Sequence, residues 1–214
     1  MQTTRSLLQH PAAKPLLFAL ALLPLSWLVF AVVWDQLGPN PAEALIRSLG
    51  DWTLRLLCLT LAITPLRHWT GWVALARFRR MLGLFTAFYA LLHFCSYAVF
   101  DMGLDWRDIV RDVAKRPFIL VGTLALLLML PLAATSFNRA IRSLGALRWQ
   151  QLHRLVYAIA LLAILHFFWM RAGKNDFAEV FVYAAVVGVL LGWRAVRAIG
   201  PRYLMKLGSH NAKG

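Results

Sequence analysis

The chain has 214 residues, of which 60% are hydrophobic and only 15% are charged, and its formal net charge is +14. A soluble domain carries about a quarter charged residues, so this composition argues against a soluble globular protein. Several apolar runs reach the roughly 20 residues that a helix needs to cross a bilayer. The sequence therefore predicts a polytopic membrane protein.

Six membrane-spanning helices are predicted in chain order. Helices are favoured over strands because the apolar runs are long, rich in Leu and Ala and without alternation, and because a helix satisfies its own backbone in lipid. Pro24 is expected to kink the first helix and Pro65 to end the second. The predicted fold is an all-α bundle forming one domain over residues 1–214, with short cytoplasmic tails at about 1–13 and 199–214. The spans are residues 14–34, 45–66, 80–100, 117–134, 149–169 and 178–196.

The positive charge lies in alternate connections rather than in one patch. Basic residues precede the first span, separate the second from the third and the fourth from the fifth, and follow the sixth. By the positive-inside rule, this pattern predicts that both termini are cytoplasmic. The basic excess is then an orientation signal with membrane lipid as its partner, and no nucleic acid is expected.

Three histidines lie inside the predicted spans, where an ionisable side chain usually has a partner or a function. His93 lies in the third span, and His153 and His166 lie thirteen residues apart in the fifth. With the predicted orientation, His93 and His166 share the outer half of the bilayer, whereas His153 lies near the cytoplasmic face. Neutral imidazole is a common ligand of haem iron. We therefore expect His93 and His166 to bind one haem and His153 to mark a second site, roughly 20 Å away along the helix.

Two features of this arrangement stay open at the level of sequence. On a straight helix His153 and His166 point more than about 90° apart, so tilt, a kink or different haem orientations must absorb the difference. The second ligand of the inner haem is also undefined. His68 lies at the right depth, Arg79 is a neighbour better suited to a propionate, and an inner haem with one protein ligand is the third option.

Several arginines are candidates for binding the acidic groups of a cofactor. Arg55 belongs to an Arg–Asp–Arg series with four-residue spacing, where it would bind a haem propionate or a quinone head group, or join an internal ion network. Near His153 the basic candidates are Arg79, Arg80 and Arg154. These residues would hold inner propionates or a flavin phosphate, or they would face lipid headgroups as orientation charges.

The connection 101–116 carries an apolar stripe at helical spacing, and Asp105 is placed to cap a helix there. We expect a short amphipathic helix at the membrane interface. Its charged face would be a docking surface for a periplasmic partner protein, or the segment would instead cover the outer haem as a lid.

Around its histidines the chain resembles the ferric-reductase-like transmembrane family. The segments that carry the resemblance are Q-L-H-R-L-V-Y-A-I-A-L-L-A-I-L-H-F at 151–167, A-L-L-H-F at 90–94 and R-R-M-L-G-L at 79–84. Within that family the chain is most similar to haem-binding membrane subunits of bacterial methionine-sulfoxide reductase systems. The resemblance covers about residues 10–200.

This resemblance implies one or two b-type haems bound by His93, His153 and His166 in the bacterial inner membrane. It implies electron flow from the cytoplasm to a periplasmic molybdopterin reductase of the MsrP type, which repairs oxidised methionine in envelope proteins. A cytosolic flavin reductase or the quinone pool is the implied donor, and members also bind FMN. The chain would then be an electron-transfer subunit and not an enzyme on its own.

Two other classes of protein compete with this interpretation. One is a proton-coupled transporter whose histidines relay protons, and the other is a plain membrane anchor with structural histidines. The sequence shows neither the inverted repeat nor the broken helices that transporters often have, which argues against the first class. A reducible b-haem spectrum would separate the electron-transfer subunit from both.

Overall fold

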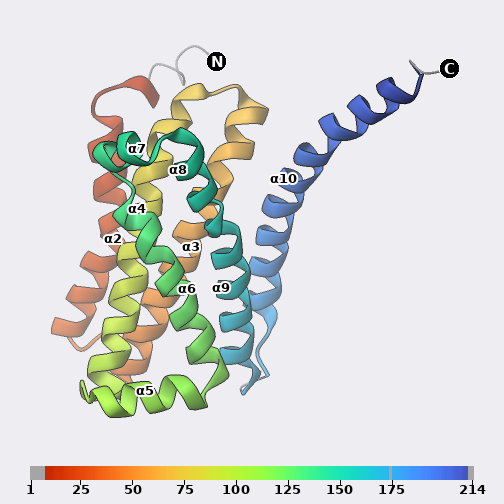
Figure 1. Ribbon diagram of the computed structural model, residues 1–214. Helices are drawn as coiled ribbons and strands as arrows, with labels where there is room; N and C mark the ends of the chain where they lie inside the picture. Colours follow the sequence, from red (N-terminus) through yellow and green to blue (C-terminus); the bar gives the residue numbers. More distant parts are fainter. Residues whose placement is uncertain (1–7, 174, 212–214) are drawn as a thin grey trace.

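The computed structural model describes residues 8–173 and 175–211, and it forms an elongated helical bundle (Figure 1). Within the described residues, six helical stretches are long and apolar enough to cross a membrane, as the sequence predicted. The predicted tails 1–13 and 199–214 lie partly outside the described residues. The principal helices are α2 (Ala13–Val33), α3 (Pro41–Thr70), α4 (Ala76–Ser96), α6 (Pro117–Ala134), α9 (Leu155–Ala172) and α10 (Ala178–Asn211).

Shorter elements connect and extend these helices. The 3₁₀ turn η1 (Val73–Leu75) precedes α4, and the π-helical turn η2 (Tyr97–Asp101) follows it. The helix α5 (Trp106–Lys115) crosses one end of the bundle, and α7 (Asn138–Leu144) and α8 (Ala146–His153) lie at the other (Figure 1). We call these the α5 end and the α7 end.

The core lies between two closely packed helix pairs, α3 with α4 and α6 with α9. Leu57 and Leu61 of α3 and Ile159 of α9 are buried there, and Val187 of α10 belongs to the same buried cluster. The outward faces of α2 and α10 carry exposed Leu, Val and Phe side chains, as expected of helices that face lipid. The helix α10 leans away from the bundle toward its C-terminal end (Figure 1).

Pro65 does not end the second span, so this prediction was wrong. The helix α3 runs through Pro65 and ends at Thr70, where Gly71 adopts a left-handed conformation. Proline lacks an N–H and so leaves the carbonyl four residues earlier without its helical donor. That carbonyl belongs to Leu61, and it accepts a hydrogen bond from the Arg194 guanidinium of α10. A tertiary contact therefore replaces the bond that proline removes.

The helix α2 also continues through its proline, Pro24. Beside it, the Tyr89 hydroxyl accepts a hydrogen bond from Leu25 N (3.0 Å) and donates one to Ala21 O (2.8 Å). These two backbone groups would bond to each other in an uninterrupted helix. Insertion of a side chain into the helical ladder is a recognised cause of helix bending.

The fifth predicted span consists of two helices, α8 and α9, which meet at Arg154. Here the backbone uses tighter i→i−3 hydrogen bonds, from Arg154 N to Gln151 O (3.2 Å) and from Tyr157 N to Arg154 O (3.0 Å). The interruption follows His153 directly. A break in the fifth predicted span therefore lies between His153 and His166.

The amphipathic helix predicted within 101–116 is present as α5, with the expected cap. The Asp105 carboxylate accepts hydrogen bonds from Arg107 N (2.8 Å) and Asp108 N (3.2 Å). Ile109 packs into the bundle, whereas Trp106 is 73% exposed. The helix thus buries one apolar edge and presents another at the surface.

Candidate functional site

His93 and His166 line the same cavity, which lies toward the α5 end and has a volume of about 520 Å³. His93 comes from α4 and His166 from α9, and α3 and α6 contribute further lining residues. The two imidazole centroids are 6.1 Å apart, and the ring planes lie at 80°. The volume falls within the range of about 300–1,000 Å³ that is usual for cofactor and small-molecule sites.

Hydrogen bonds to backbone carbonyls fix the tautomer of both rings. Nδ1 of His93 lies 2.8 Å from Ile46 O, and Nδ1 of His166 lies 2.6 Å from Phe118 O. A carbonyl oxygen only accepts, so each Nδ1 must carry the proton and donate it. In a neutral imidazole Nε2 is then unprotonated, which is the state that binds a metal. Metal-ligating histidines characteristically donate their other N–H in this way.

Two glycines allow the rings to lie directly against neighbouring helices. A Cβ atom at Gly122 of α6 would lie 2.7 Å from Nδ1 of His166. A Cβ atom at Gly50 of α3 would lie 3.1 Å from Cε1 of His93. The absence of a side chain at both positions therefore lets each Nδ1 reach its backbone acceptor.

The paired imidazoles suit a macrocycle-bound iron better than a bare metal ion. Within residues 8–173 and 175–211, no three His, Cys, Asp or Glu side chains gather as a metal-ion site would require. Haem iron needs only axial ligands from the protein. A histidine pair fits that requirement, in a cavity whose lining is mainly apolar but also includes Glu43, Arg47, Asp51, Asp101 and Arg116.

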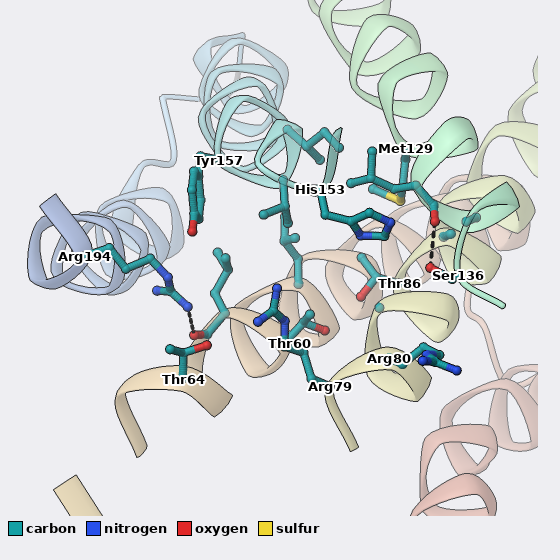
Figure 2. Close-up of a pocket in the computed structure, with 18 of the residues that line it drawn as sticks. Thr60, Thr64, Arg79, Arg80, Thr86, Met129, Ser136, His153, Tyr157 and Arg194 are labelled. Carbon is teal, nitrogen blue, oxygen red and sulfur yellow. Dashed lines mark hydrogen bonds between the residues drawn. The ribbon is translucent and has the colours of Figure 1, made fainter. Parts of the chain in front are cut away.

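His153 lines a second cavity of about 590 Å³, nearer the α7 end (Figure 2). The Trp149 ring stacks on the His153 ring, with centroids 3.9 Å apart and an interplanar angle of 28°. Nε2 of His153 lies 3.1 Å from the Thr135 hydroxyl. Among the described residues that line this cavity there is no second histidine.

The His153 cavity is strongly basic. No Asp or Glu is found among its described lining residues, and within the described chain none of its arginines pairs with a carboxylate. Arg80 donates to the Asn138 side chain (2.7 Å), and Arg194 donates to Leu190 O (2.7 Å). Such uncompensated charge favours an anionic ligand. The arginines in the lining are Arg79, Arg80, Arg194 and Arg197.

Arg79, Arg194 and His153 approach this cavity from three helices, α4, α10 and α8 (Figure 2). Leu57, Met129 and Ile159 line both this cavity and the His93/His166 cavity, and all three are buried. The two cavities therefore share an apolar wall.

Three candidates from the sequence do not line either cavity. His68 lies beside Trp193, a lining residue of the His153 cavity, with ring centroids 5.7 Å apart. Arg55 donates to the Tyr183 hydroxyl (3.1 Å) and does not line either of these two cavities. Arg154 is exposed at the break between α8 and α9.

Several residues that line the cavities were not identified as site residues from the sequence, among them Arg194, Arg197 and Arg116. Arg194, which was interpreted as an orientation charge, lines the His153 cavity. Arg116, which was interpreted as part of a surface loop, lines the His93/His166 cavity. Pro65 could have pointed to Arg194, because a proline there leaves the Leu61 carbonyl without its helical donor, so that another part of the chain must supply one.

The fold and the site together define a class: polytopic helical membrane proteins with a paired-histidine cavity inside the bundle. Comparison with known proteins is more specific. Residues 49–164 match the model of the "Ferric reductase like transmembrane component" family. The chain belongs to this ferric-reductase-like transmembrane family and, within it, groups with the MsrQ proteins.

The MsrQ relatives match most of the chain. The "Protein-methionine-sulfoxide reductase heme-binding subunit MsrQ" of Polaromonas naphthalenivorans is 67% identical over 87% of this chain and 85% of its own length. Its counterpart in Ralstonia nicotianae is 54% identical over 87% and 88%, respectively. That of Herminiimonas arsenicoxydans is 53% identical over 83% and 82%. No solved structure matches the chain.

Proposed function

We propose that the chain is the haem-binding membrane subunit of a protein-methionine-sulfoxide reductase and carries electrons through the membrane. The names of the MsrQ relatives describe such a haem-binding subunit. In this chain, the observation that carries the proposal is the facing pair of imidazoles of His93 and His166. Each has Nδ1 bound to a backbone carbonyl and Nε2 free for a metal.

His93 and His166 are the residues that would hold one b-type haem. Their ring centroids are 6.1 Å apart and both rings line one cavity, so both imidazoles would be close enough to contact the same bound group. When bound, the haem would supply a one-electron redox centre, and the protein would supply ligation and an apolar surrounding.

His153 is the proposed ligand of a second haem in the basic cavity. The Trp149 ring stacks on its ring. The Thr135 hydroxyl donates its proton to Pro131 O (2.7 Å), so Nε2 of His153 donates to that hydroxyl, and binding through Nε2 would require the imidazole to give up this proton. Arg79 and Arg80 would bind the acidic groups of this haem, or the phosphate of FMN if a flavin occupies the cavity instead. Arg55 and Arg154, predicted to contact a propionate, quinone or phosphate, and His68, predicted as an inner-haem ligand, do not line either cavity and have no role in this proposal.

We place both termini in the cytoplasm of a bacterium and the α5 end at the periplasmic face of its inner membrane, on the basis of the positive-inside rule. The two cavities then lie in series across the bilayer, within one domain that spans the whole chain. The proposed acceptor is a periplasmic molybdopterin methionine-sulfoxide reductase, and the donor is a cytosolic flavin reductase or a quinol. Catalysis would belong to the acceptor.

Electron transfer to the acceptor can be tested in proteoliposomes. The purified chain is reduced with dithionite, excess reductant is removed, and the α-band is followed after addition of the molybdopterin reductase and methionine sulfoxide. We expect reoxidation that requires both additions, and liposomes given either one alone serve as controls. Haem that binds but stays reduced would contradict the electron-transfer role, and a colourless protein would contradict haem binding.

A further inference from the structure

One carboxylate at the α5 end joins three elements of the fold. The Tyr97 hydroxyl of η2 donates a 2.6 Å hydrogen bond to Oδ2 of Asp112 in α5. The same carboxylate accepts two hydrogen bonds from the guanidinium of Arg116, at the junction of α5 and α6. The Asp112 side chain is only 18% exposed. It thus ties the end of α4, the surface helix and the start of α6 together.

Each partner of Asp112 lies close to an element that positions one of the paired histidines. Tyr97 follows His93 by four residues, so the two side chains lie on the same side of consecutive helical turns, and both line the cavity. Arg116 lies over the Phe118 ring at 5.7 Å, and the Phe118 carbonyl is the acceptor for Nδ1 of His166. The carboxylate is therefore linked to both halves of the imidazole pair.

We infer that Asp112 is a positioning residue for the His93/His166 site, and that through it the surface helix α5 controls how the two imidazoles face each other. The spectroscopic test of this inference rests on the proposed function. If the inference holds, a molecule that displaces α5 would alter the site without contacting His93 or His166.

Two further observations support this role. Tyr97 begins a π-helical turn, a rare backbone form that is frequent at functional sites. The hydrogen bonds from Arg116 and then from Tyr97 lower the pKa of Asp112 below its ordinary value, against the opposing effect of burial. Lys115 lowers it further, and Asp101 is the other nearby carboxylate. A depressed pKa means that the stabilisation is complete at neutral pH and is lost only as the pH falls through the folded-state value.

The same helix offers a matched control. Asp108 pairs with Arg111 at 3.0 Å, but both belong to α5 and both are more than half exposed. Asp108→Asn and Asp112→Asn remove the same charge from the same helix. Only the second change breaks a contact between elements.

The test compares these variants in full-length purified protein by electron paramagnetic resonance and redox titration. We expect Asp112→Asn to retain haem but to shift the g-values and the midpoint potential of the low-spin centre. Asp108→Asn should match the wild type, Asp112→Glu should restore most of the signal, and Tyr97→Phe should give a smaller shift in the same direction. Wild-type g-values and potential in both Asp112→Asn and Tyr97→Phe would overturn the inference.

Hydrogen exchange provides a readout that does not depend on haem. In Asp112→Asn, amides of 94–97 and 118–122 should exchange faster, whereas Asp108→Asn should affect α5 alone. Wild-type protection in both segments would overturn the positioning role even if no low-spin haem were found. Absence of the low-spin signal from the wild type would instead count against the proposed function, so the two failures are distinguishable.

Discussion

Replacement of Gly122 by alanine is expected to remove haem from the His93/His166 site while the helical bundle still assembles. The added methyl group would lie 2.7 Å from Nδ1 of His166, which is too close for non-bonded atoms. Either the ring or α6 must move, and the hydrogen bond from Nδ1 to Phe118 O is then lost. A buried donor or acceptor left without a partner costs about 1–3 kcal/mol. The ligand would also lose the orientation that iron requires.

The measurement is haem per polypeptide, determined by the pyridine haemochrome method on purified protein. The matched control is Gly188→Ala in α10, where a Cβ atom would meet nothing within 4 Å. That variant should keep its full haem content, because alanine favours a helix over glycine by about 1 kcal/mol. Full haem and a wild-type spectrum in Gly122→Ala would show that close packing of the ring on α6 is not what positions the ligand.

Replacement of Arg194 by glutamine is expected to give a large loss of thermal stability. Its guanidinium supplies the hydrogen bond that Pro65 cannot give to the Leu61 carbonyl. It also lies over the Tyr157 ring at 5.8 Å. An unsatisfied carbonyl within a membrane protein is expensive, and we expect a loss of about 1–3 kcal/mol or more. Thermal unfolding in detergent, followed by circular dichroism, measures the change.

Two further variants make this prediction specific. Arg197→Gln removes the same charge from the same cavity, but Arg197 contacts Trp193 only by stacking at 5.2 Å, so its effect should be small. Pro65→Ala restores an N–H that can bond to Leu61 O within α3. The loss caused by Arg194→Gln should therefore shrink in the Pro65→Ala background, and equal losses in both backgrounds would contradict the proposed role of the contact.

The features that sequence predicted well are those set by local pattern. Long apolar runs gave the six spans, and Asp105 was recognised as a cap because its role depends only on the next few residues. The equal depth of His93 and His166 followed from counting residues along helices of known rise. Their shared cavity agrees with that count.

The features that sequence missed depend on partners from other helices. Nothing local shows that Arg194 of α10 completes the ladder at Pro65, so the proline was taken as a helix end. The break at Arg154 has no Pro or Gly to mark it. His68 lies beside Trp193, which lines the His153 cavity, but His68 itself does not line it. Depth can be read from residue number, whereas direction depends on how the helices pack.

The central claim is that His93 and His166 bind one haem between them. The most direct test is the reduced-minus-oxidised spectrum and haem content of the purified wild type beside His93→Ala, His166→Ala and His153→Ala. We predict a reducible low-spin b-type spectrum whose same component disappears in His93→Ala and in His166→Ala but persists in His153→Ala. An unchanged spectrum in both His93→Ala and His166→Ala, or a colourless wild type from haem-replete cells, would contradict the claim.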